Sequence, residues 1–231
     1  VQVIVSLPPD AAPDLGSVEV RIGGERVALA MPQTYMNESG QAVGRLARRH
    51  GMPAHIATVS RLVCDLHRRE DDPAAVPSES DGTLIPGNIG ADIERRTALY
   101  HRPYEAFAQM VAEAQPSLIL AIHSFTPVMG STGEQRPWDV GLLYNQDDRA
   151  ARIAIDLFEG MGFTVGDNQP YSGKQLNATM DRHAEANGIP YLTIELRQDL
   201  VSRKSHQAVW ADRIAQVAQQ VQAALSATPE T

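Results

Sequence analysis

His123 is the first residue whose type and position suggest chemistry, because it directly follows the most continuous apolar run of the chain, residues 117–122. Such a run is typical of a strand covered on both faces of a parallel sheet. In open α/β sheets ligands bind at the carboxyl ends of the strands, where a neutral imidazole is a good metal ligand. The competing interpretation is a histidine that only satisfies its own hydrogen bonds at the end of a strand.

Glu195 interrupts a second apolar segment, residues 190–196. Because side chains alternate along a strand, Thr193, Glu195 and Arg197 would share one face. Burial would raise the pKa of the Glu195 carboxyl group and prepare it to act as a general base. On an edge strand the same residue would be a solvated carboxylate.

The apolar pattern predicts a strand at residues 56–66. Three polar side chains stand at every-second positions in this strand and directly after it. Arg61, Asp65 and His67 would lie on one face, so that a guanidinium, a carboxylate and an imidazole converge on one surface. An exposed edge strand explains the same pattern without a site. The sequence contains no HExxH, GxSxG, P-loop or CxxC motif, so none of these strong signals decides the chemistry.

Composition limits the class of protein. At roughly 150 residues per domain, 231 residues make one large domain or two small ones. A net charge of −8 argues against a nucleic-acid coat or a polybasic membrane binder. The single cysteine, Cys64, excludes an internal disulfide, and no apolar run reaches the ~20 residues of a membrane span. We therefore expect a cytoplasmic α/β protein with a single domain over residues 1–226 and a disordered tail at 227–231.

The elements that must position these side chains follow from the apolar periodicity. Strands are expected at residues 1–7, 18–22, 25–30, 56–66, 117–122, 140–145 and 190–196, with a hairpin across Gly23 and Gly24. Helices are expected at residues 39–50, 91–114, 148–162 and 206–226, the second of them broken near Pro103 and buried along Tyr100, Tyr104, Phe107 and Val111. Residues 69–88 are expected to be a long loop. From residue 56 onward, strands alternate with helices, which predicts a mainly parallel sheet with crossover helices.

Eight segments between residues 57 and 215 resemble, in their order, segments of the N-formylglutamate amidohydrolase family. They read SRLVCDLHR, SDGTLIPGN, YHRPYEAF, HSFTPVM, RPWDVGLLYNQDDR, VGDNQPYSGK, DRHAEANGIPY and IELRQDL. The resemblance implies a fold similar to that of zinc carboxypeptidases, an α/β sandwich around a mainly parallel or mixed sheet. It also implies hydrolysis of the N-formyl, or another N-acyl, amide of glutamate or a similar acidic amino acid, assisted by a divalent metal, usually zinc. The expected partner is a small-molecule substrate, with no nucleic acid and no membrane; the oligomeric state stays open.

The resemblance also assigns roles to single residues. It implies that His123 is a metal ligand and that Glu195 is the general base that takes a proton from metal-bound water. Glu38 falls at the acidic position of the family's ligand-bearing stretch, as a second metal ligand, and Thr34 falls at its histidine. His67 stands where the family usually has asparagine.

Substrate contacts are implied in the same way. Arg61, with Arg68 and Arg197 as further candidates, would hold a substrate carboxylate or stabilise the oxyanion. Asn168 and Tyr171 would contact the substrate.

The front of the chain departs from the family, whose members open with a strand and a histidine-bearing turn. No histidine precedes His50 here, which predicts a weak or missing metal site. Residues 27–46, VALAMPQTYMNESGQAVGRL, instead resemble a block of bacterial peptidyl-tRNA hydrolases in which Asn37 would contact the peptide. Residues 1–52 are thus either spliced from another family or a diverged first strand and helix. Two alternative functions stay open: an inactive homologue that binds carboxylates, and peptidyl-tRNA hydrolysis, for which an acidic chain is a poor match.

Overall fold

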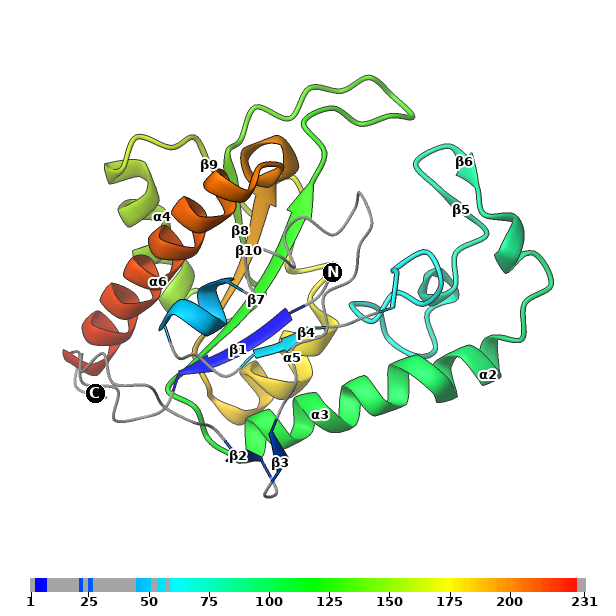
Figure 1. Ribbon diagram of the computed structural model, residues 1–231, viewed down its shortest axis with the longest axis horizontal. Helices are drawn as coiled ribbons and strands as arrows, with labels where there is room; N and C mark the ends of the chain where they lie inside the picture. Colours follow the sequence, from blue (N-terminus) through cyan, green and yellow to red (C-terminus); the bar gives the residue numbers. More distant parts are fainter. Residues whose placement is uncertain are drawn as a thin grey trace.

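The computed structural model describes residues 3–7, 21–22, 25–26, 45–50, 54–56 and 59–227, with the strands before residue 57 described by their backbone (Figure 1). Its centre is a six-stranded sheet in the order β4, β1, β7, β10, β8, β9. These strands are β1 (Val3–Leu7), β4 (Ala54–Ile56), β7 (Leu118–Phe125), β8 (Val140–Leu143), β9 (Val165–Asp167) and β10 (Tyr191–Arg197).

The sheet is mixed, which confirms one of the two expected arrangements. β7 is parallel to β10 and β8 is parallel to β9. β1 is antiparallel to both β4 and β7, and β8 is antiparallel to β10. The regular crossover pattern expected from residue 56 onward is wrong, because residues 126–139 lead from β7 to β8 without a helix and β8 enters the sheet in the opposite direction.

Helices cover both faces of the sheet (Figure 1). α4 (Arg149–Gly160) and α6 (Lys204–Ala227) pack on one face, together with Leu46 of the helical residues 45–50. α3 (Arg102–Glu113) and α5 (Ala178–His183) pack on the other face. Alternate side chains of β7 therefore enter two different cores, Leu118, Leu120 and Ile122 the first and Ile119 and Ala121 the second. This is the expected α/β sandwich.

The helix expected at residues 91–114 is broken before Pro103, as predicted, but the break changes which side chains are buried. α2 (Ile93–Arg96) continues through a π-helical turn, Thr97–His101, into α3. A π turn holds one residue more than an α turn, so the buried stripe moves by one position. His101 is fully buried, whereas Tyr100 is 37% exposed, which corrects its expected place in the stripe. The rest of the stripe packs on the core as expected: Tyr104, Phe107 and Val111.

The strand expected from residue 56 to residue 66 ends at Ile56, and turns follow it, which corrects that prediction. Polar side chains compete with the sheet for backbone groups here. The Asp65 carboxylate accepts a hydrogen bond from His67 N at 3.1 Å, and the Ser60 hydroxyl accepts one from the backbone two residues further on. The alternative interpretation, an exposed edge strand over the same residues, is therefore wrong as well.

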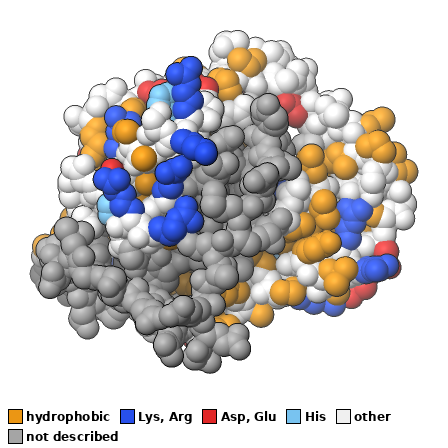
Figure 2. All heavy atoms as spheres, viewed as in Figure 1, with side chains coloured by type: hydrophobic (Ala, Val, Ile, Leu, Met, Phe, Trp, Pro, Cys, Tyr) orange, Lys and Arg blue, Asp and Glu red, His pale blue; other side chains and the backbone are white. Residues whose placement is uncertain are grey.

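Polar contacts hold the long loop to these turns. The loop contains the hairpin of β5 (Glu79–Ser80) and β6 (Thr83–Leu84), flanked by 3-10 turns at Pro73–Ala75 and Pro86–Asn88. Asn88 donates to the carbonyls of Leu62 and Pro77 at 2.7 and 2.6 Å, which fixes the loop to the segment before His67. Four apolar side chains of this loop and of the helical turns after it are exposed: Leu84, Ile89, Ile93 and Leu99. Figure 2 shows hydrophobic side chains gathered on the right of the molecule.

One further prediction for the front of the chain is confirmed, and others concern residues outside the described ranges. β2 (Arg21–Ile22) and β3 (Glu25–Arg26) pair antiparallel, as the predicted hairpin requires. Residues 8–20, 27–44 and 228–231, and with them Thr34, Asn37 and Glu38, lie outside the described residues. Within the described ranges, no helix combines the length and the apolar character that crossing a bilayer requires.

Candidate active site

The two leading candidates, His123 and Glu195, lie side by side. They are directly paired in the register of the parallel strands β7 and β10, which are the two central strands of the sheet. Laterally paired residues point to the same face, so both side chains point to the face covered by α3 and α5, the face of Ile119 and Tyr191. An imidazole and a carboxylate thus share one surface close to the carboxyl ends of both strands.

Burial controls the charge of both groups. Glu195 is 5% exposed, and its Oε2 has no hydrogen-bond partner among the described residues. Because removal from water disfavours the charged form, burial raises the pKa of Glu195 to about 8, against the smaller opposing effect of nearby positive charges. Burial, reinforced by the neighbouring His67, holds the pKa of His123 well below its usual value, so this imidazole is neutral at pH 7.

The turns after β4 bring a second set of polar side chains to the same place. The rings of His67 and His123 lie 4.6 Å apart between centroids. The Asp65 carboxylate accepts a hydrogen bond from Arg61 at 2.8 Å, and Arg68 approaches it at 3.9 Å. Burial lowers the pKa of His67, although Asp65 opposes the shift. The convergence expected of residues 61–67 is therefore real, but turns produce it.

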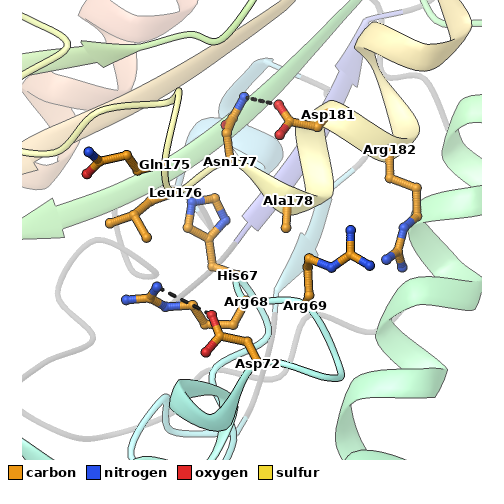
Figure 3. A pocket seen from close by; sticks show the side chains of 10 residues that line it. All are labelled: His67, Arg68, Arg69, Asp72, Gln175, Leu176, Asn177, Ala178, Asp181 and Arg182. Atoms are coloured by element: carbon orange, nitrogen blue, oxygen red, sulfur yellow. Dashed lines mark hydrogen bonds and ion pairs between the residues drawn. The ribbon is translucent and has the colours of Figure 1, made fainter.

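A cavity of about 390 Å³ opens beside His67, between residues 67–72 and the start of α5 (Figure 3). This volume is within the range of small-molecule sites. Arg68 and Asp72 form one side of the cavity, with 3.5 Å between their charged groups, and Arg69 and Arg182 face each other on another. The lining of this small cavity beside His67 is therefore mixed in charge, with three arginines, Asp72 and Asp181.

The other side of Glu195 is closed by a loop that packs on β8. Gly141 of β8 is paired with Glu195, and a Cβ built at Gly141 would lie 2.1 Å from the carbonyl oxygen of Gln169. Asn168, at φ +52°, accepts hydrogen bonds through Oδ1 from the backbone N–H groups of Tyr144 and Gly173 at 3.1 and 2.9 Å. In this structure the Asn168 amide therefore holds the loop in place.

Two candidates remain, Tyr171 in this loop and Arg197 at the end of β10. Tyr171 is hydrogen-bonded through its hydroxyl to the guanidinium of Arg136 at 3.2 Å. Arg197 lies two residues beyond Glu195 and forms ion pairs with Asp139 at 3.3 Å and Asp199 at 2.8 Å. The Arg197 guanidinium therefore already has two carboxylate partners.

A comparison with known families decides what kind of site this is. The sequence matches the N-formylglutamate amidohydrolase family over residues 29–202. The chain belongs to this family. It is therefore a hydrolase that acts on an amide bond.

Solved structures agree with the assignment. A gene product of Agrobacterium tumefaciens is 27% identical, with a TM-score of 0.74, over 82% of this chain and 78% of that one. The N-formylglutamate amidohydrolase of Ralstonia eutropha has the same fold at 20% identity, with a TM-score of 0.57, over 82% of this chain and 81% of that one. No curated protein matches the sequence.

The amidohydrolase resemblance implies a metal ion, and the described residues supply part of the ligand set that such an ion needs. His123 is neutral and its buried Nε2 has no hydrogen-bond partner within the described residues, which is the protonation state that a metal ligand needs. His67 supplies a second imidazole beside it. In residues 45–50 and 59–227, however, no three His, Cys, Asp or Glu side chains form a group that could hold an ion. The described part of this amidohydrolase therefore offers two nitrogen donors of the type that zinc takes.

Two residues of the site region are not among the candidates that the sequence pattern indicates. Arg136 lies in the RPWDVGLLYNQDDR segment, outside any periodic element, and only the fold brings it to Tyr171. His101 became visible only through the π turn: its Nε2 donates to the carbonyl oxygen of Arg68 at 2.7 Å, which fixes the backbone next to His67.

Replacing His101 with leucine should lower the free energy of unfolding by about 1–3 kcal/mol, because the partly buried carbonyl of Arg68 loses its donor. Urea denaturation measures the loss. Tyr100→Phe is the matched control in the same π turn and should be neutral, since Tyr100 is exposed. Equal stability of both variants would show that the contact with Arg68 contributes nothing.

Proposed function

We propose that this chain hydrolyses the N-formyl, or a related N-acyl, amide of glutamate or a similar acidic amino acid, with Glu195 as general base. One observation carries the proposal: Glu195 and His123 are paired on adjacent central strands and point to the same face, with the Glu195 side chain and the Nε2 atom of His123 buried. Membership of the family supports the amide bond. The guanidinium group of Arg61, which acts electrostatically on both residues, and that of Arg68, which lines the cavity, support an acidic substrate.

Amide hydrolysis needs a base for the attacking water and an acid for the leaving nitrogen. In its ionised form, Glu195 would take a proton from the water that attacks the formyl carbon. The protonated carboxyl group would then give this proton to the amine nitrogen as the C–N bond breaks, which yields formate and the free amino acid. A pKa of about 8 suits both steps, because such a group gains and loses its proton near neutral pH.

Arg61 is the best placed of the proposed substrate contacts. Its positive charge acts on both Glu195 and His123, so it lies close to the reacting groups, and about half of its side chain remains exposed. Arg61 would stabilise the negative charge that develops on the formyl oxygen. Arg68, which lines the cavity, would bind a carboxylate of the amino acid.

His123, with His67 beside it, would hold the divalent metal. Both imidazoles have a lowered pKa and can present a neutral nitrogen. When bound, the metal would polarise the formyl carbonyl and lower the pKa of the attacking water.

The purified chain, supplied with zinc, should release one formate per glutamate from N-formyl-L-glutamate. Chelation should lower the rate about 100-fold or more, because a polarising metal supplies several kcal/mol of transition-state stabilisation, and zinc should restore the rate. Enzymatic formate detection and amino-acid analysis measure the two products. A rate that does not change on chelation would exclude the metal, and a zinc-saturated chain that hydrolyses no N-acyl amino acid would exclude the activity.

Nothing favours the other two interpretations of the sequence. An inactive homologue would not need an acid and an imidazole paired on central strands. The resemblance to peptidyl-tRNA hydrolases falls on residues 27–46, mostly outside the described residues.

A further inference from the structure

Arg136 is a buried cation that only neutral groups contact among the described residues. It is 7% exposed and lies in the segment that connects β7 to β8 along the chain. Its Nη1 donates to the hydroxyls of Thr126 at 3.3 Å and Tyr171 at 3.2 Å, and its Nη2 contacts Met129 Sδ at 3.5 Å. The guanidinium carbon lies 5.2 Å from the centre of the Tyr171 ring. Two elements of the site wall therefore fix its orientation.

This surrounding differs from that of the other arginines near the site. Arg61, Arg68 and Arg197 each form ion pairs with carboxylates, whereas Arg136 has no carboxylate within ion-pair distance among the residues that the structure describes. Arginine stays charged at every physiological pH. Burial of an unpaired charge is strongly unfavourable, so the position calls for an anion that is not part of the described protein.

The two carboxylates on which Arg136 acts electrostatically have other roles. Arg136 acts electrostatically on Glu195 and on Asp81, but forms an ion pair with neither. Asp81 accepts hydrogen bonds from the backbone N–H groups of Gly130 and Ser131, both at 2.8 Å. Glu195 is the base of the proposed reaction. The free partner position of Arg136 therefore lies within electrostatic reach of the reacting centre.

We infer that Arg136 binds a carboxylate of the acidic substrate, and that Tyr171 orients the guanidinium for this contact. The inference rests on the proposed function and adds a specificity-determining residue to it. A guanidinium whose direction is fixed in advance loses little freedom when it forms two parallel hydrogen bonds to a carboxylate. The scissile amide would then lie at Glu195 while one carboxylate of the same molecule reaches Arg136.

Substrate analogues test this inference through turnover. Arg136→Gln should lower kcat/KM for N-formyl-L-glutamate about 30-fold to 1000-fold, as expected for one lost partner of a buried charge pair. N-formyl-glutamine and N-formyl-glutamate α-amide each keep one carboxylate, and N-formyl-glutamate diamide keeps none. For the analogue that lacks the carboxylate bound by Arg136, and for the diamide, Arg136→Gln should lower kcat/KM by less than about 3-fold. The analogue that escapes the loss identifies the carboxylate. An equal loss on all four compounds would overturn the inference.

Binding separates this inference from the proposed activity. Calorimetric titration of N-formyl-L-glutamate should give a Kd at least about 30-fold weaker for Glu195→Gln/Arg136→Gln than for Glu195→Gln alone, even if the chain hydrolyses nothing. Equal affinities would overturn the inference whatever the activity. Tyr171→Phe should weaken the same binding less than Arg136→Gln does.

Two controls exclude loss of folding as the cause. Arg213→Gln is matched, because Arg213 also lies over aromatic rings, those of Phe163 and Trp210, on the opposite face of the sheet; it should leave kcat/KM unchanged. Removal of a buried unpaired charge should leave the Tm of Arg136→Gln unchanged or higher. A large fall in Tm, with binding lost for Arg136→Lys and Arg136→Gln alike on every analogue, would assign Arg136 a structural role instead.

Discussion

Replacing Glu195 with glutamine should lower kcat for the N-formyl amide by about 10²–10⁴-fold, the usual contribution of a positioned general base. Glutamine has nearly the same shape but cannot take a proton from water, so KM should change little. Initial rates of formate release measure the effect. Glu113→Gln, an exposed glutamate on α3, should retain full activity.

The same substitution should stabilise the metal-free fold at alkaline pH. The folded-state pKa of Glu195, about 8, lies above the ordinary value of 4.5, so the folded protein holds a proton that the unfolded chain releases. The stability that this proton provides is complete below pH 4.5 and is lost as the pH rises to about 8. With 1.36 kcal/mol per pKa unit, the loss is on the order of 4–5 kcal/mol, and glutamine avoids it.

Thermal unfolding of chelator-treated protein at several pH values measures this second effect. The Tm of Glu195→Gln should exceed that of the unsubstituted chain by about 8–20 °C at pH 9, at roughly 2–4 °C per kcal/mol for a chain of this size. Near pH 4.5 the difference should vanish. A variant that is less stable than the original chain at pH 9 would mean that Glu195 is not buried in a neutral form.

The opposite consequences of one substitution reflect the conflict built into the site. The sheet would be more stable with a neutral side chain at residue 195, yet the proposed reaction needs a group that can ionise. The fold therefore retains an unfavourable buried acid next to a neutral imidazole, and such conflicts are typical of active sites.

How far the sequence could predict this site depends on the kind of contact. His123 and Glu195 were identifiable because each interrupts a long apolar run, and runs of that kind belong to central strands. That they lie opposite each other depends on the pairing of β7 with β10, two strands separated by 65 residues of sequence. The separate local patterns do not contain that register; only the family resemblance pointed to a shared site.

Errors arose where local interactions override the apolar pattern. Residues 61–67 have the alternation of a strand, but hydrogen bonds from Ser60 and Asp65 to the nearby backbone turn the chain. The π turn exchanges Tyr100 for His101, because one additional residue shifts the buried stripe. Arg136 could not be found by periodicity, since the role inferred for it depends on the lack of a carboxylate partner among the described residues around it in three dimensions.

Gly141→Ala should be the most damaging small substitution near the site. The added Cβ would lie 2.1 Å from the Gln169 carbonyl oxygen and 3.4 Å from the Cβ of Glu195. The first contact involves backbone, so a side-chain rotation cannot relieve it, and residues 168–173 must move away from β8. Overpacking of this kind destabilises by about 1–3 kcal/mol or more, which predicts a fall in Tm of roughly 3–10 °C.

The substitution should also reduce activity, because the displaced loop carries Tyr171 and forms the wall that keeps water from Glu195. As water enters, the pKa of Glu195 should fall toward its ordinary value and the base should weaken. Gly160→Ala is the matched control: a Cβ there meets nothing within 4 Å, and alanine is the better residue near the end of a helix such as α4. Thermal unfolding and formate release, measured on both variants, test this prediction. A Gly141→Ala protein as stable and as active as the control would show that the loop does not pack against β8 as described.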